Sequence, residues 1–353
     1  MSATSAAAEI DSLKGELQQI FSDGLVVIVG SGVSAAEGIP GMGALEVHLN
    51  AQVPKLVTGD DLECWKAIAV ELAKKVGLEA ALLTVAPTDA LEDVILGLTA
   101  DLIESAETRI LEEVITGKRI LPLSKLLPHL NPQPNRALPV ITPNYERLIE
   151  AAAEIIGWGV DSMFIGNTLG RFDQQISQRS FLKEVQIKSK RAIYTYRNRI
   201  ALAKPHGSLD WYQHADGPVR CSIKLPLPKL IITPGRNKYH RGYAIPFDRH
   251  RELGNTAIDH AARLLILGYG FNDDHLETHL SQSLRRGKPA LILTRSLSGN
   301  ATKVIAQSPN AIALSENPAV TTGVTVTRQS GRVEHKFAPI WQVSTFVDII
   351  LNP

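Results

Sequence analysis

The feature that most constrains this chain is an unbroken apolar run that ends in a glycine turn. Leu25 to Val29 are five consecutive apolar residues, mostly β-branched, and Gly30-Ser31-Gly32 follows directly. Such a run is typical of a strand buried on both faces, as in a parallel sheet covered by helices. The glycines allow a tight turn and a close approach of the backbone to a ligand. The next helix, with Ser31 or Ser34 as its expected cap, would present free N–H groups to a phosphate.

Later apolar runs extend this pattern. They lie at 137–142, 229–234, 263–268 and 289–294, and each ends at glycine, proline or a polar residue. We therefore predict an α/β protein with a Rossmann-like parallel sheet, helices on both faces of the sheet, and 289–294 as its last strand.

Residues 44 to about 130 carry apolar side chains at helical spacing, which predicts a helical module inserted after the first strand. The predicted organisation is 1–43 as the start of the Rossmann-like domain, 44–135 as the inserted helical module, and 136–353 as the remainder of the domain with a C-terminal extension. We interpret the carboxylates of the module as solvated helix faces; they include Glu104, Glu107, Glu112 and Glu113.

Composition excludes several classes of protein. The 353 residues are 44% hydrophobic and 21% charged with a net charge of +1, which gives no general attraction to nucleic acid or to anionic membranes. No run approaches the ~20 apolar residues of a membrane span, and no secretory signal is evident, so we expect a cytoplasmic protein without a membrane partner. Two cysteines, Cys64 and Cys221, cannot form a four-cysteine zinc site, and no metal is expected.

Four segments, in the same order, resemble the motifs of the sirtuin-like NAD-binding family. In chain order they are Gly30-Ser31-Gly32-Val33-Ser34 with Gly38-Ile39-Pro40, then Thr142-Pro143-Asn144-Tyr145-Glu146, then Lys204-Pro205-His206-Gly207-Ser208-Leu209, then Gly268-Tyr269-Gly270-Phe271-Asn272-Asp273. The fourth resembles in particular the branch of sirtuin-like bacterial NAD hydrolases. Two positions depart from the family: Glu146 stands where aspartate is commoner, and Gly41-Met42-Gly43 replaces an aromatic residue and an arginine that contact the cofactor in deacylases.

The resemblance implies a site for NAD+ at the carboxyl edge of the sheet. It makes Asn144 and His206 the catalytic residues. The residues that it implies for binding NAD+ are Gly30, Ser31, Gly32, Ser34, Ile39, Pro40, Thr142, Gly268, Tyr269, Gly270, Asn272 and Asp273. An amide can orient water or a ribose hydroxyl, and histidine is suited to accept a proton near neutral pH. The glycines and serines of the first turn would hold the pyrophosphate, and Asn272 and Asp273 would receive ribose hydroxyls.

The expected activity follows from what the chain lacks relative to deacylase sirtuins. The four-cysteine zinc ribbon is absent, and the helical block takes the place of the usual small module. We therefore predict an NAD+ glycohydrolase that gives nicotinamide and ADP-ribose. Sirtuin-like domains of this kind act in bacterial anti-phage defence through NAD+ depletion. Because an unrestrained NAD+ hydrolase would kill its host, we also expect control by self-assembly into a homo-oligomer or by a separate partner, such as the HerA-type ATPase or helicase that some of these domains work with.

Two other classes of function stay open at this point. One is a zinc-free sirtuin-type deacylase or ADP-ribosyltransferase, and the other is a non-catalytic nucleotide-sensing subunit of a DNA-associated complex. The segment from Arg179 to Arg199 holds seven Lys and Arg with Tyr194 and Tyr196, a composition that suits nucleic acid or a protein partner. A solvated hairpin is the commoner structure for such a run. Direct nucleic-acid binding, the activating trigger and the preference for NAD+ over related nucleotides stay undecided.

Overall fold

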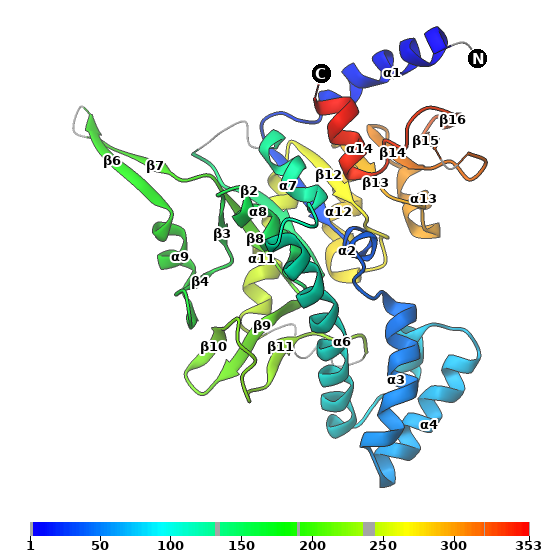
Figure 1. Cartoon of the computed structure of the whole chain (residues 1–353), viewed down its shortest axis with the longest axis vertical. Coiled ribbons are helices and arrows are strands. Elements are labelled where there is room, and N and C mark those ends of the chain that lie inside the picture. The colour runs from blue at the N-terminus through cyan, green and yellow to red at the C-terminus, as the bar shows by residue number, and fades with distance from the viewer. Residues whose placement is uncertain (1–2, 131–134, 189–190, 236–243, 321, 353) are drawn as a thin grey trace.

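A large, mostly parallel sheet forms the centre of the protein (Figure 1). The computed structural model describes residues 3–130, 135–188, 191–235, 244–320 and 322–352. Within these ranges, nine strands pair in the order β16-β15-β14-β13-β12-β1-β2-β8-β3. The strands from β14 to β3 are parallel to one another, and β15 and β16 continue the sheet antiparallel. Their bounds are β1 Leu25–Val29, β2 Leu138–Ile141, β3 Gly159–Asp161, β8 Arg199–Ala203, β12 Arg263–Leu267, β13 Ala290–Leu293, β14 Ala311–Glu316, β15 Val324–Arg328 and β16 Gly331–His335.

Alternate residues of the buried strands pack on opposite faces of this sheet. Leu25, Val27 and Val29 belong to one hydrophobic cluster, whereas Val26 and Ile28 belong to another. The first face is covered by α1 Ala3–Gln18, α6 Asp89–Ile115, α7 Pro122–Leu126, α8 Leu148–Ile155, α14 Val343–Phe346 and the π-helical turn Val347–Leu351. The second face is covered by α11 Phe247–His260, α12 Asp274–Arg285 and α13 Gly299–Ile305. The predicted Rossmann-like sheet with helices on both faces is therefore confirmed.

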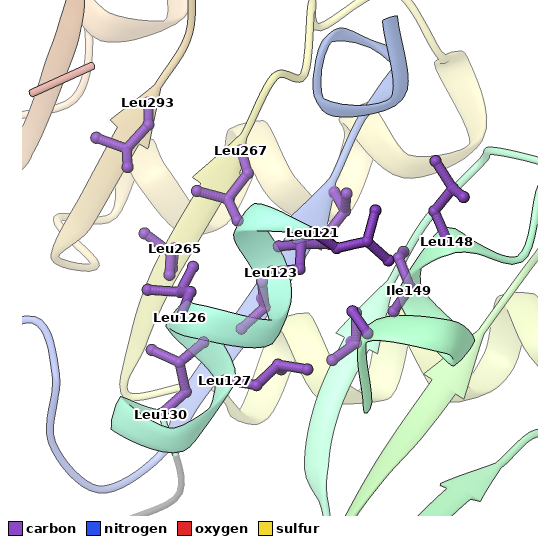
Figure 2. Close-up of a cluster of buried hydrophobic side chains, with 14 of the residues drawn as sticks. Leu121, Leu123, Leu126, Leu127, Leu130, Leu148, Ile149, Leu265, Leu267 and Leu293 are labelled. Atoms are coloured by element: carbon purple, nitrogen blue, oxygen red, sulfur yellow. The ribbon is translucent and has the colours of Figure 1, made fainter. Parts of the chain in front are cut away.

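Leucines dominate the contact between the short helix α7 and the sheet. Figure 2 shows Leu123 and Leu126 of α7, and Leu130 of the turn that follows, gathered with Leu265 and Leu267 of β12. All five side chains are buried. This packing ties residues 121–130 to the sheet rather than to the helices that precede them.

The chain reverses direction across the sheet between β1 and β12. From β1 the chain adds β2, β3 and β8 on one side, where β8 lies between β2 and β3, and it then returns to β12, β13 and β14 on the other side. The loops after β1 and β12 therefore diverge at the carboxyl edge, which is where open α/β sheets bind ligands.

Most of the helices between β1 and β2 form a separate small bundle. They are α3 Met42–Leu56, α4 Gly59–Ala73, α5 Leu78–Thr84 and α6. Leu49, Trp65 and Ile68 are buried at the centre of this bundle. The long helix α6 begins in the bundle and ends on the sheet, because Leu91 and Ile95 are buried in the bundle, whereas Ile103 and Ile110 belong to the cluster on the sheet.

A second, smaller sheet was not predicted. Its order is β11-β9-β10-β5-β4 within the described residues. Its strands are β4 Phe164–Ile165, β5 Gly170–Phe172, β9 Gly207–His214, β10 Gly217–Arg220 and β11 Lys229–Ile231. The run at 229–234 is thus an edge strand of this sheet, not a strand of the central one. The prediction that 289–294 is the last strand was also wrong, since β14, β15 and β16 follow it.

The basic segment forms a projecting ribbon of two strands. β6 Leu182–Lys188 pairs antiparallel with β7 Arg191–Tyr196, and residues 189–190 between them lie outside the described ranges. Every residue of β6 is exposed, and the ribbon extends away from the body in Figure 1. The hairpin interpretation is therefore confirmed.

In the described parts of the chain no helix combines the length and apolarity needed to cross a bilayer.

Candidate functional site

A cavity of about 290 Å³ opens at the carboxyl edge of the central sheet. The loops after β1, β2, β8 and β12 all contribute to its wall, as do the helical bundle and the residues that follow β11. Ten of the predicted residues line it: Ser31, Ser34, Ile39, Pro40, Asn144, His206, Tyr269, Gly270, Asn272 and Asp273. The structure therefore brings together side chains from all four motifs.

The glycine turn packs against the loop after β12. The backbone N–H groups of Gly30 and Gly32 donate to the carbonyls of Leu267 and Gly268, at 2.8 and 2.9 Å. A Cβ on Gly30 would lie 2.5 Å from the Gly268 carbonyl oxygen, so only glycine permits this approach.

These hydrogen bonds change the expected role of the turn. The N–H groups of Gly30 and Gly32 are already hydrogen-bonded to carbonyls of the protein. Gly30 is the N-cap of helix α2 (Ser31–Glu37) and no side chain caps this helix, so the expected serine cap is wrong. Gly30 and Thr142 line neither this cavity nor the one described next.

A second cavity lies along the other side of α2 and the turn. It measures about 700 Å³, and its wall includes Gly32, Gly268, Thr294 and Arg295. Gly32 and Gly268 thus face this cavity rather than the first one.

Asn144 is held by two neighbours in the first cavity. Its amide donates to Ser34 Oγ at 2.9 Å and to Glu146 Oε1 at 3.1 Å, and the Ser34 hydroxyl donates to the same Glu146 oxygen. The Asn144 backbone N–H donates to Thr142 Oγ1 at 3.1 Å, which gives Thr142 a place behind the site. Because both amide protons are engaged, the amide oxygen is the group that Asn144 offers to water or to a ribose hydroxyl.

His206 pairs with a carboxylate from the fourth motif. Its Nε2 lies 3.1 Å from Asp273 Oδ2, and both side chains are about 10% exposed. The sequence resemblance suggested ribose binding for Asp273, whereas the structure places it on the histidine. Gly207 has φ +85°, and a Cβ there would lie 2.0 Å from the Leu230 carbonyl oxygen. The glycine after His206 is therefore required by the close passage of β11.

A buried lysine joins the loops that carry Asn144 and His206. Lys204 is 1% exposed, and its Nζ donates to the carbonyls of Tyr145 and Glu146 at 3.2 and 2.7 Å. It also donates to Glu150 Oε1 at 2.9 Å and to Ser208 Oγ at 3.1 Å. Lys204 stands two positions before His206, and its hydrogen bonds thus fix the start of the His206 loop to the residues that follow Asn144.

Three carboxylates influence the phenol of Tyr145 in the cavity wall. Burial raises the pKa of Tyr145 well above its ordinary value, and the negative charges of Asp273, Glu79 and Glu146 raise it further. The Tyr145 hydroxyl donates to the Ile232 carbonyl at 2.5 Å, so it stays protonated and structural.

A buried histidine lies behind Lys204. His250 is fully buried, its Nδ1 accepts the Lys204 backbone N–H at 3.2 Å, and its ring lies 4.6 Å from that of Trp211. Burial, followed by the positive charge of Lys204, lowers the pKa of His250 to about 3.

This histidine predicts an acid-dependent loss of stability. Below pH ~6.5 an unfolded chain protonates this histidine, whereas the folded chain does so only near pH 3. Stability is therefore unaffected by His250 above pH 6.5, and it decreases by about 1.4 kcal/mol per pH unit as the pH falls from there. We expect His250→Asn, which keeps an acceptor for the Lys204 N–H, to flatten this slope in denaturant unfolding between pH 7 and pH 5. Equal slopes for the two proteins would contradict the prediction.

Several wall residues come from the helical bundle and were not predicted. Met42 and Leu45 of α3, Glu79 of α5 and Ile103 of α6 all line the first cavity. The sequence carries no local signal for them, because they are ordinary residues of amphipathic helices.

Among the described residues there is no group of three or more His, Cys, Asp or Glu side chains placed to hold a metal ion.

Comparison with known proteins agrees with the motif assignment. Residues 139–310 match the family model of the SIR2-like domain. This match supports a sirtuin-like family, and it includes the loops that carry Asn144, His206 and Asp273. Among curated proteins, none matches the chain. A solved structure described as "Structural Basis for the Mechanism and Regulation of Sir2 Enzymes" aligns over 84% of this chain and 90% of its own, at 13% identity and a TM-score of 0.37. The SIR2-like assignment therefore rests on the family match, which suggests NAD-dependent activity.

Proposed function

We propose that this protein is an NAD+ glycohydrolase that cleaves NAD+ to nicotinamide and ADP-ribose. The observation that carries the proposal is the presence of Asn144 and His206 in one cavity, at the carboxyl edge of a sheet whose SIR2-like region suggests NAD use. The bond to be broken joins a cationic pyridinium to ribose, so the leaving group needs no acid. Positive charge develops on the ribose as this bond breaks, as in other glycoside cleavages.

Carboxylates line the first cavity, which suits the cationic nicotinamide end of NAD+. In this arrangement the Asn144 amide oxygen orients the attacking water or a ribose hydroxyl. His206, oriented by Asp273, accepts the proton that is released.

We place this activity in anti-phage defence by NAD+ depletion, with control by assembly of the chain or by a HerA-type partner. Support for assembly comes from the β6–β7 ribbon, whose side chains Val185, Ile187 and Tyr194 are 48%, 81% and 51% exposed. A two-stranded ribbon is marginally stable alone in water, so packing against another chain would stabilise it.

The test is incubation of purified protein with NAD+ over a range of protein concentrations, with chromatographic separation of nicotinamide, ADP-ribose and cyclic products. We expect hydrolysis by the wild type and a loss of about 10²–10⁴-fold in Asn144→Ala and His206→Ala. Asn50→Ala and His214→Ala change residues outside the cavity wall, so they should retain activity.

Other outcomes would point elsewhere. Equal activity in all variants would contradict the catalytic assignment. Turnover only with an acylated lysine peptide would identify a zinc-free deacylase, and label transferred to protein would identify an ADP-ribosyltransferase. Binding of NAD+ in calorimetry without turnover at any protein concentration would favour a nucleotide-sensing subunit.

A further inference from the structure

The two faces of the β6–β7 ribbon differ in composition. Residues that lie directly opposite each other on two antiparallel strands point to the same face of the ribbon. On one face Val185 lies opposite Tyr194, and Ile187 lies opposite Ala192. We call these four residues the apolar face. The other face is mostly polar, and its cross-strand pairs are Glu184–Thr195, Gln186–Ile193 and Lys188–Arg191.

The apolar face is open to solvent. Ile187 is 81% exposed, Val185 and Tyr194 are about half exposed, and Ala192 is exposed as well. The ribbon extends away from the body of the protein in Figure 1. An antiparallel sheet with one apolar and one polar face normally has its apolar face packed against another layer. We therefore expect this face to be covered when the protein assembles.

The charges of the ribbon narrow the choice of partner. None of the four residues of the apolar face is charged, whereas nucleic-acid binding depends on Lys and Arg contacts to phosphate. Lys188 and Arg191 belong to the other face, and Lys183 lies at the irregular pairing near the base of the ribbon. Two copies of the apolar face can therefore meet without bringing like charges together. The net charge of +1 adds little repulsion between whole chains.

The shape of the apolar face suits an identical face. The large Ile187 lies beside the small Ala192, so a projection stands next to a hollow. A two-fold axis along the ribbon exchanges the two strands, so each copy places its Ile187 over the Ala192 of the other. The same rotation places Val185 over Tyr194. Sheets that pack face to face interdigitate their side chains in this way.

We infer that the partner of the apolar face is a second copy of this chain, packed face to face about a two-fold axis, and that this contact controls the site. The inference rests on the proposed function, in which assembly of the chain controls NAD+ hydrolysis. It names the surface that assembles.

The ribbon is connected to the site through β8. This strand follows β7 directly, and His206 stands three residues after its end. The Tyr196 ring at the base of the ribbon lies against the guanidinium of Arg199 at the start of β8, 4.4 Å from ring centre to guanidinium carbon. A contact that orders the ribbon therefore also restrains the strand that leads to His206.

The first experiment measures self-association by sedimentation velocity over a range of protein concentrations, without nucleotide. We expect the wild type to form dimers, and Ile187→Lys to raise the dissociation constant about 100-fold, because a charge then enters the apolar contact from both copies. Gln186→Lys adds the same charge to the other face and should leave the dissociation constant within about twofold of wild type. Both positions are exposed, so each monomer should keep its thermal stability.

Chemical cross-linking tests the two-fold arrangement. In a Cys64→Ser background the remaining native cysteine, Cys221, is buried. A short bis-maleimide should then join two copies of Tyr194→Cys and leave Thr195→Cys, on the other face, monomeric. Equal cross-linking of the two variants, or none in Tyr194→Cys, would contradict the face-to-face contact.

The association measurements separate this inference from the proposed function. A wild type that is monomeric at every concentration, or an equal effect of Ile187→Lys and Gln186→Lys, would overturn the contact and leave NAD+ hydrolysis untouched. Dimers that depend on the apolar face, in a protein without hydrolysis, would support the contact while the proposed function fails. In an active protein, Ile187→Lys should lower hydrolysis per chain where the wild type is dimeric. Unchanged hydrolysis there would overturn the control of the site by this contact.

Discussion

Replacing Lys204 with methionine is expected to lower the free energy of unfolding by about 3–5 kcal/mol at pH 7. The substitution keeps the length of the side chain and removes four hydrogen bonds from Nζ, which is 1% exposed. It leaves the Glu150 carboxylate, 15% exposed, without its cation. Loss of one partner of a buried pair is costly because the other charge remains desolvated.

The pH dependence of this variant provides a specific check. Burial already raises the pKa of Glu150, and the charge of Lys204 opposes that rise. Without Lys204 the pKa of Glu150 rises further, so the folded variant takes up a proton that the unfolded chain takes up only near pH 4.3. The deficit of the variant relative to wild type should therefore shrink as the pH falls from 7 to 5.

Two further proteins serve as controls for Lys204→Met. The double variant Lys204→Met/Glu150→Gln removes both charges and should recover part of the loss in denaturant unfolding. Lys66→Met breaks an exposed pair with Glu63, 59% and 70% exposed, and should change stability by no more than about 0.5 kcal/mol. A Lys204→Met loss no larger than that of Lys66→Met would contradict the role of the buried network.

The central sheet could be predicted from the sequence because its strands are local signals. Four or five consecutive apolar residues and a terminating glycine are enough to predict β1 and β12, and alternate residues then pack on opposite faces. The second sheet could not be predicted in this way. Its strands β4 and β5 are two and three residues long, and β5 pairs with β10, which lies about 50 residues further along the chain.

The residues of the candidate site could be predicted from the sequence, but most contacts between them could not. Motif resemblance predicted ten of the residues that line the first cavity. It did not predict that the Gly30 and Gly32 N–H groups are used by the loop after β12, nor that Asp273 pairs with His206. These contacts join segments more than 60 residues apart, so no local pattern records them.

The environment of Glu107 likewise could not be predicted from the local sequence. Its neighbours on a polar helix suggested a solvated carboxylate, and that interpretation was wrong because its side chain is 0% exposed. The partner that makes burial tolerable is Arg147, 40 residues further along the chain, whose Nη2 lies 2.5 Å from Glu107 Oε2. Only the folded structure brings the two together.

Replacing Arg147 with methionine is therefore expected to destabilise the fold by about 3–5 kcal/mol as well. Arg147 Nε donates to both Glu107 oxygens at 3.2 and 3.1 Å, and its backbone N–H donates to the same carboxylate. Burial lowers the pKa of Arg147, but the hydrogen bond and charge of Glu107 outweigh this and hold the pKa above its ordinary value. The variant leaves Glu107 buried on α6 without its cation.

The matched variants test whether Arg147 stabilises the fold through its charge or through the packing of its large side chain. Arg147→Met/Glu107→Leu removes both charges and should recover most of the loss in denaturant unfolding, whereas Arg249→Met breaks an exposed pair and should have an effect below about 0.5 kcal/mol. Equal losses for the single and double variants would show that packing, not charge, matters here.

The same pair has a consequence for the site. Arg147 stands three residues after Asn144, and Glu107 lies on α6, which also contributes Ile103 to the cavity wall. The pair therefore fixes the loop of Asn144 to the helix that extends into the bundle. We expect the double variant, though folded, to show a lower kcat for NAD+, because the loop that carries Asn144 then loses its tie to α6 and keeps its tie to Lys204, through the Tyr145 and Glu146 carbonyls.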